Sequence, residues 1–446
     1  MPTNPDGYLY SLLALEASVI AVITWVMWHH RSGLLIGHNS PSRRVGFAFS
    51  HVLVALLAVD AMERRVSGPS FLASIPVVGR LATFLVPRLP LLVFLMSLLL
   101  LVCVALLPPI GQPGYINGFS RLWVPWITWS VTSSLLAANK SSSSQWTDYL
   151  VSVSVLFACI MAMQRISAPI RLKVVRFGLQ ISAALSLGAL IIDRNWAVTT
   201  VWTGGFLGPE RLQGVFPQPN TAGAMFAVLL LITLLDRSDH KLFALFEISL
   251  AAVPLYLTGS RGAVLACCGA LVAAWAFRSY PRIFKSALLV LSAGAVLVPV
   301  TLGASSVWLN GRATTWTVAL EIWSNNPIVG GGAWPATEGG LPSALYAHNQ
   351  LLQSLAETGV IGFFLLFGAL KHSAQRVLAT GTQIAASLMV MVIVQLYFEN
   401  GFRIFTPQFV FPTVILIAAM GAGFRQDTAR SVPERLSGKL RWPVPQ

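Results

Sequence analysis

The chain has 446 residues, of which 55% are hydrophobic and only 10% are charged. Soluble globular domains usually carry about 25% charged residues, so this composition excludes an ordinary soluble protein and indicates a polytopic membrane protein. The net charge of +14 does not indicate nucleic-acid binding, because lysines and arginines gather in short breaks between apolar runs, as the positive-inside rule expects. We therefore expect membrane lipid as a partner and no nucleic acid.

Apolar runs long enough to cross the hydrocarbon core, about twenty residues each, recur along the chain. They predict an all-α transmembrane bundle of about 12–14 helices, with candidate spans near residues 8–28, 45–62, 90–110, 121–138, 146–164, 171–192, 220–236, 241–258, 261–278, 284–304, 348–370, 381–398 and 407–424. The first run lacks a basic n-region and is too long for a signal peptide, so we expect a retained span. The predicted organisation is one transmembrane domain over residues 1–424 and a basic cytoplasmic tail over residues 425–446.

Basic residues orient the bundle from about residue 146 onward. They mark cytoplasmic breaks near residues 165–176, 237–241, 278–285 and 371–376, and they recur in the tail. By elimination, the outer face of the membrane holds the breaks at residues 193–219, 258–261, 305–347 and 399–406. These outer breaks contain arginines although the positive-inside rule disfavours basic residues there, so each arginine requires a reason.

Phosphate binding is one such reason. The planar guanidinium donors of arginine match phosphate oxygens and keep their charge. Arg211, Arg261 and Arg312 lie in outer breaks beside glycines that would let the backbone approach a lipid-linked diphosphate. An interfacial arginine can also be a snorkelling side chain or a member of a rim salt bridge, and Glu399 has such a neighbour in Arg403. For Arg261 the phosphate role is favoured, because an unpaired charge in so short a break is costly.

A histidine ends the long outer break. His348 precedes a new apolar run, where it could be a polar interfacial residue or a group that transfers a proton near neutral pH. Asn349 could orient a substrate or cap the helix that begins near Gln350. Asn220 opens another span after Pro219.

Several short motifs occur in a fixed order over about residues 200–370. They are Arg211-Leu212-x-Gly214 with Pro219-Asn220, Ser260-Arg261-Gly262, Gly311-Arg312-x-x-x-Trp316, Gly330-x-Gly332, and His348-Asn349 with Glu357-x-Gly359-x-x-Gly362. Together they resemble the O-antigen ligase and polymerase family of membrane glycosyltransferases.

The resemblance implies a multi-spanning helical transferase similar to the GT-C type, with no metal ion and no cofactor. Its donor would be a glycan on undecaprenyl diphosphate, and its acceptor a glycan or lipid-linked hydroxyl on the outer face of the bacterial cytoplasmic membrane. Arg211 and Arg261 would bind the diphosphate, Arg312 would be an accessory contact, and His348 would activate the acceptor. Asn220, Asn349 and Glu399 complete the predicted site.

Ligase and polymerase both stay open, since the long outer break has only about forty residues and an additional N-terminal span is expected. A transporter or flippase of lipid-linked oligosaccharide is the alternative from another class. It would place ionisable residues near the middle of the membrane, whereas the distinctive residues here lie at one rim. A cell-wall polymerase of the SEDS type would show a carboxylate-centred pattern, which this sequence does not.

Overall fold

The computed structural model describes residues 117–136, 168–192, 194–205, 208–216, 218–236, 241–279, 312–332, 347–379 and 382–398. These residues are mostly helical. The longer helices are α5 (Asn117–Leu136), α7 (Ala168–Ile192), α9 (Pro219–Leu235), α10 (Lys241–Thr258), α11 (Arg261–Ser279), α13 (Arg312–Asn325), α14 (Gln350–Ala379) and α15 (Gln383–Phe398). The expected spans near 8–28, 45–62, 90–110, 146–164, 284–304 and 407–424, and the tail, lie outside the described residues.

The helix ends agree closely with the apolar runs in the middle of the chain. The run at 241–258 is α10. The run at 220–236 differs from α9 by one residue at each end, and the run at 261–278 differs from α11 by one residue at its end. The run at 348–370 is too short, because α14 continues to Ala379. Lys371 and Arg376, which the sequence placed in a break after the run, lie in the last turns of α14. Basic residues are compatible with this position because the C-terminal end of a helix dipole is negative.

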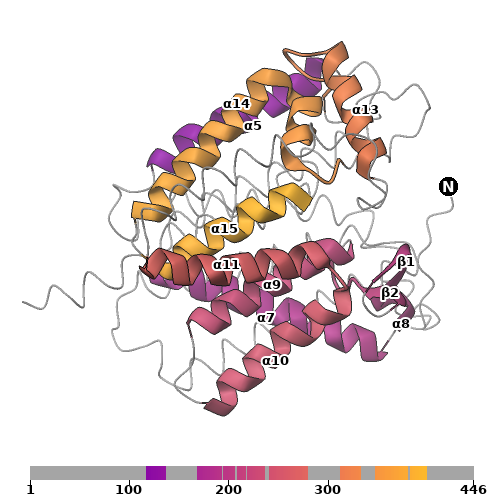
Figure 1. Cartoon of the computed structure of the whole chain (residues 1–446), viewed down its shortest axis with the longest axis vertical. Helices are drawn as coiled ribbons and strands as arrows, with labels where there is room; N and C mark the ends of the chain where they lie inside the picture. Colours follow the sequence, from indigo (N-terminus) through magenta and orange to yellow (C-terminus); the bar gives the residue numbers. More distant parts are fainter. Residues whose placement is uncertain are drawn as a thin grey trace, which may run out of the picture.

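Helix α9 lies at the centre of the bundle, with α7, α10, α11 and α15 packed around it (Figure 1). Its sequence is apolar on all sides, and most of its residues are buried. A helix that is hydrophobic all round requires neighbours on every side. Pro219 stands in the first turn, where its missing N–H leaves no helical hydrogen bond unmade.

The connections fix which helix ends lie together. A two-residue turn, Gly259 and Ser260, joins the end of α10 to the start of α11. Helix α15 begins beside the end of α11, where Gln383 Nε2 donates to the carbonyl oxygen of Ala274 at 3.3 Å. Because α14 ends only a few residues before α15 begins, the first turns of α11 and α14 lie at the same end of the bundle (Figure 1).

A β-hairpin that the all-α prediction missed lies at this same end. After the short helix α8 (Arg194–Ala197), strands β1 (Val198–Gly205) and β2 (Gly208–Leu212) pair antiparallel, with Thr199 opposite Arg211. Threonines along β1 favour a strand, and Gly205 and Gly208 at the two facing strand ends are compatible with a hairpin. The hairpin matters for function because it carries Arg211.

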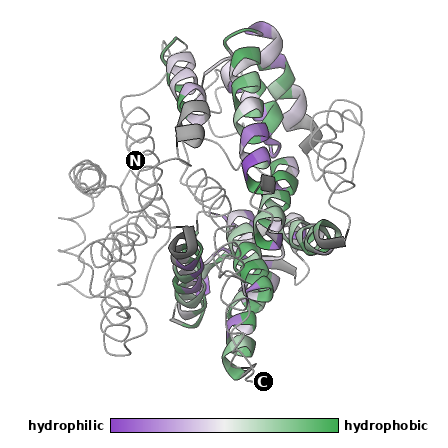
Figure 2. Ribbon diagram, turned by 90° about the vertical axis from the view of Figure 1, so that its left-hand side faces the viewer, coloured by the Kyte–Doolittle hydropathy of each residue, from purple (hydrophilic) through white to green (hydrophobic). Residues whose placement is uncertain are grey.

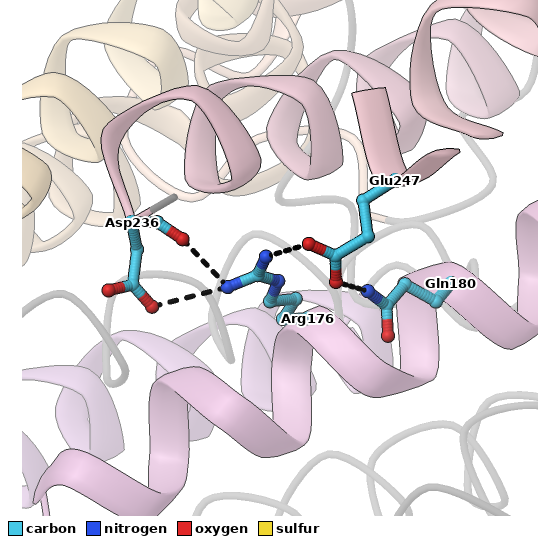
Figure 3. A network of polar contacts seen from close by, with 4 residues as sticks. All are labelled: Arg176, Gln180, Asp236 and Glu247. Carbon is cyan, nitrogen blue, oxygen red and sulfur yellow. Dashed lines mark hydrogen bonds and ion pairs between the residues drawn. The ribbon is translucent and has the colours of Figure 1, made fainter. Parts of the chain in front are cut away.

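An ion-pair network ties α7, α9 and α10 together near the other end of α9 (Figure 3). Arg176 of α7 bonds to the Glu247 carboxylate of α10 and lies 3.3 Å from Asp236 Oδ2, just after α9. Gln180 Nε2 donates to the second Glu247 oxygen at 2.5 Å. The sequence suggested that Arg176 marks a basic turn, but it lies inside α7. Two carboxylates compensate its charge there.

The outer helices expose hydrophobic faces. Large apolar side chains of α10 and α11 are accessible, namely Leu242, Phe243, Leu245, Phe246, Val253, Tyr256, Leu265, Val272 and Trp275. Hydrophobic residues cover most of the described helices in Figure 2. Within the part of the chain that the structure describes, one helix, α14, is long and apolar enough to cross a membrane, over Gln350–Val377; the other apolar helical stretches are shorter.

Candidate functional site

Arg211 is held at one end of the bundle by two hydrogen bonds to other elements. Its Nε donates to the carbonyl oxygen of Thr258 at 2.6 Å, and its Nη2 donates to Asn220 Oδ1 at 2.6 Å. Thr258 is the last residue of α10, and Asn220 lies in the first turn of α9. A guanidinium held on two sides is preorganised, so little rotamer entropy remains to be lost when it meets an anion.

The turn between α10 and α11 sets the position of Arg261. Gly259 has a φ of 58°, which an L-residue rarely adopts. The buried hydroxyl of Ser260 caps α11 by accepting from Ala263 N at 3.4 Å, and Thr258 Oγ1 accepts from Ser260 N at 3.3 Å. Arg261 is then the first residue of α11 and is exposed. Arg261 therefore adds its charge to a helix N-terminus, the end that favours anions.

Close helix packing holds this turn against α9. A Cβ atom on Gly223 of α9 would lie 2.5 Å from Ser260 Cβ and 2.8 Å from Thr258 Oγ1. Only glycine permits that approach, so α9 and the turn have little freedom to separate. The structure thus brings Arg211 and Asn220, which are nine residues apart, together with Thr258, which follows Arg211 by 47 residues and precedes Arg261.

His348 and Asn349 lie where α14 begins. Asn349 is fully buried, and its Oδ1 accepts from Leu351 N at 3.0 Å and Leu352 N at 3.1 Å. This is a helix N-cap, the second of the two roles that the sequence left open for this residue. His348 is half-buried and has a φ of 47°, the one positive φ of a non-glycine residue in the described ranges.

Helix α14 is broken nine residues after its start. Gly359 has φ 65° and ψ −168°, a conformation available essentially only to glycine. The break frees backbone groups that the segment after α13 satisfies: Val360 N donates to Pro327 O at 2.9 Å, and Gly331 N donates to Ala356 O at 2.8 Å. A broken helix is tolerated at membrane depth when its freed backbone groups find such partners.

Helix α5 satisfies further carbonyls at the break. Ser133 Oγ donates to Glu357 O at 2.8 Å, and Trp129 Nε1 donates to Thr358 O at 2.9 Å. The first part of α14, which follows His348, is thereby fastened to two neighbouring elements. In the sequence, Gly359 and Gly362 were singled out only as members of a motif. The break at Gly359 could not be predicted, because a hydropathy pattern does not record it.

Two predicted site residues lie partly or wholly outside what the structure describes. Arg312 is the first residue of α13, and its side chain lies outside what the structure describes. Glu399 lies outside the described residues altogether. Sequence reasoning missed Gln353, which is buried and accepts a hydrogen bond from Ala347 N, the residue before His348. The sequence feature that could have identified Gln353 is its spacing from Glu357, since the two are polar residues four positions apart in an apolar run.

Residues 246–367 match the family model of the O-antigen ligases. The match supports the O-antigen ligase family for this segment. The O-antigen ligase segment covers most of α10, all of α11 and α13, and α14 beyond its break; it includes Arg261 and His348, whereas Arg211 precedes it.

No curated protein matches the chain. The match of residues 246–367 supports a glycosyltransferase-like enzyme of polysaccharide biosynthesis.

Proposed function

We propose that the chain is a multi-spanning glycosyltransferase of the bacterial cytoplasmic membrane. It transfers a glycan from a polyprenyl diphosphate, such as undecaprenyl diphosphate, to an acceptor hydroxyl on the outer face. The observation that carries the proposal is the clamped Arg211 beside the turn that positions Arg261, in a chain whose 246–367 segment is of the O-antigen ligase family.

The membrane setting is supported by the exposed faces of α10 and α11. Leu265, Val272 and Trp275 follow one another at helical spacing on α11, and α10 exposes a similar stripe. In water such faces would promote association, whereas in lipid they need no further cover. The shorter apolar helices then act as spans together with α14.

Arginines assist departure of the leaving group in this mechanism. Arg211 and Arg261 bind the diphosphate in the ground state and stabilise the negative charge that grows on it as the bond to the sugar breaks. Preorganised donors are effective because they do not reorganise during the reaction. A diphosphate is already a good leaving group, so the proposed mechanism uses no metal ion and no cofactor.

His348 acts on the acceptor. Its imidazole takes the proton of the acceptor hydroxyl while the oxygen attacks the anomeric carbon, and the polyprenyl diphosphate leaves from the opposite face with inversion. The bond formed is the new glycosidic bond, and the bond broken joins the anomeric carbon to the diphosphate oxygen. A positioned general base typically contributes about 10²–10⁴-fold to the rate.

The test is transfer by purified protein with a polyprenyl-diphosphate glycan and a set of candidate acceptors. We expect His348→Ala to lower the transfer rate by about 10²-fold or more, and Arg261→Ala to weaken donor use. Arg194→Ala is the matched control, because Arg194 is an exposed arginine near the same hairpin that pairs with Glu210 at 2.5 Å. Parent rates for both site variants would refute the assignment.

The product distinguishes the two types of transfer. A ligase gives one glycosylated acceptor, whereas a polymerase gives a ladder of repeat units. Movement of intact lipid-linked glycan across the membrane with no new glycosidic bond would instead identify a flippase.

A further inference from the structure

A buried hydrogen-bond chain leads from inside α14 to the residue before His348. Glu357 Oε1 accepts from Gln353 Nε2 at 2.6 Å, and Gln353 Oε1 accepts from Ala347 N at 2.9 Å. Glu357, Gln353 and Ala347 are 5%, 1% and 0% exposed. We propose that Gln353 is a positioning residue that fixes His348 for proton transfer; this inference rests on the proposed function of His348.

The chain has one direction. The backbone N–H of Ala347 can only donate, so the oxygen of the Gln353 amide faces it and the NH₂ group faces Glu357. The carboxyl oxygen of Glu357 fits this orientation, because it accepts a hydrogen from the NH₂ group of Gln353. Gln353 and Glu357 lie four residues apart on α14 and therefore on the same face of the helix. Glu357 thus selects the orientation in which Gln353 can hold Ala347.

The carbonyl side of Ala347 is held as well. Trp316 Nε1 of α13 donates to Ala347 O at 2.6 Å, and Trp316 packs in the same buried cluster as Ala347 and Leu352. Both backbone polar groups of Ala347 are therefore bonded to buried side chains from two helices. After His348, Asn349 is fixed by its N-cap bonds.

These bonds explain how His348 keeps its backbone conformation. A φ of 47° is uncommon for a residue with a side chain, and such conformations persist when the surroundings determine them and are concentrated at functional sites. Here the residue before His348 and the residue after it are each fixed by buried hydrogen bonds. The Cα–Cβ bond of the half-buried His348 therefore has a fixed direction, and proton transfer requires such a fixed orientation.

The experiment measures single-turnover transfer and the donor KM with a polyprenyl-diphosphate glycan. Gln353→Leu removes the acceptor for Ala347 N; we expect the rate to fall by about 10–100-fold and the donor KM to stay within about twofold. Ser354→Ala is the matched control, because Ser354 is a buried neighbour whose hydroxyl lies 3.2 Å from Thr358 Oγ1. It should keep the parent rate.

A double-mutant cycle separates positioning from a general loss of structure. In the His348→Ala background, Gln353→Leu should lower the residual rate by less than about twofold, since residues that act as a unit are not additive. The same fold-loss in both backgrounds, or a parent rate for Gln353→Leu, would overturn the inference.

Trp316→Phe serves if Gln353→Leu does not fold. It keeps a smaller aromatic ring in the cluster and removes the donor to Ala347, and we expect a fall of about 3–10-fold that also depends on His348. A parent rate for Trp316→Phe would overturn the inference. Failure of the proposed function looks different, because His348→Ala would then itself transfer glycan at the parent rate.

Discussion

Gly359 offers the sharpest test of the break in α14. Replacing it with alanine puts a Cβ atom 2.2 Å from Ile328 O, 2.4 Å from Ile328 C and 2.7 Å from Gly330 N. All three are backbone atoms of the segment after α13, so no flexible side chain can move aside. Either this segment leaves α14, or residue 359 abandons its φ of 65°.

The expected cost is that of the first response, in which the segment moves away and residue 359 keeps its φ of 65°. Holding a residue with a side chain in a conformation meant for glycine costs about 1–3 kcal/mol. Separating the segments also lengthens bonds such as Val360 N to Pro327 O and Gly331 N to Ala356 O, each of which contributes about 1 kcal/mol. We therefore expect Gly359→Ala to lower the free energy of unfolding by roughly 3–5 kcal/mol.

Denaturant unfolding in mixed micelles measures this change. Gly368→Ala is the control on the same helix, because a Cβ there would have no atom within 4 Å; alanine in place of helical glycine should stabilise the protein by about 0.5–1 kcal/mol. A loss of less than about 1 kcal/mol for Gly359→Ala would mean that the glycine contact does not hold the break.

Other variants test the arginine clamp and the ion network. Asn220→Ala removes the Nη2 partner of Arg211, so we expect the donor KM in the transfer assay to rise by about 3–10-fold, the effect of one typical hydrogen bond. An unchanged KM would count against the clamp. Glu247→Gln removes the charge opposite Arg176 and should lower the free energy of unfolding by about 2–3 kcal/mol in the micelle titration. Glu210→Gln, in an exposed pair, should cost less than about 1 kcal/mol, and an equal loss in both would contradict the role of burial.

Helix positions could be predicted where polar residues interrupt the apolar sequence sharply. The break at Thr258–Ser260 gives the end of α10 and the start of α11 directly, because a span ends where hydrogen-bonding and charged groups reach the interface. The same reasoning selected Arg211 and Arg261 as one group, and the structure places Arg211 in contact with Thr258.

Features that depend on distant partners could not be predicted in this way. Arg176 and Glu247 are 71 residues apart, and only the fold shows that they meet. The hairpin that carries Arg211 has no strong alternation of apolar and polar residues. The break at Gly359 depends on one backbone conformation inside an apolar run, which hydropathy does not record.

The most direct measurement of the central claim is a single-turnover reaction of the purified parent protein with a doubly labelled donor, one label in the glycan and one in the polyprenyl chain. The account predicts that glycan appears on the acceptor hydroxyl and polyprenyl diphosphate is released in equal amounts, at a rate that His348→Ala lowers by about 10²-fold or more. Release of polyprenyl diphosphate without glycan transfer to any acceptor, or transfer that is unaffected by His348→Ala and Arg261→Ala, would contradict it.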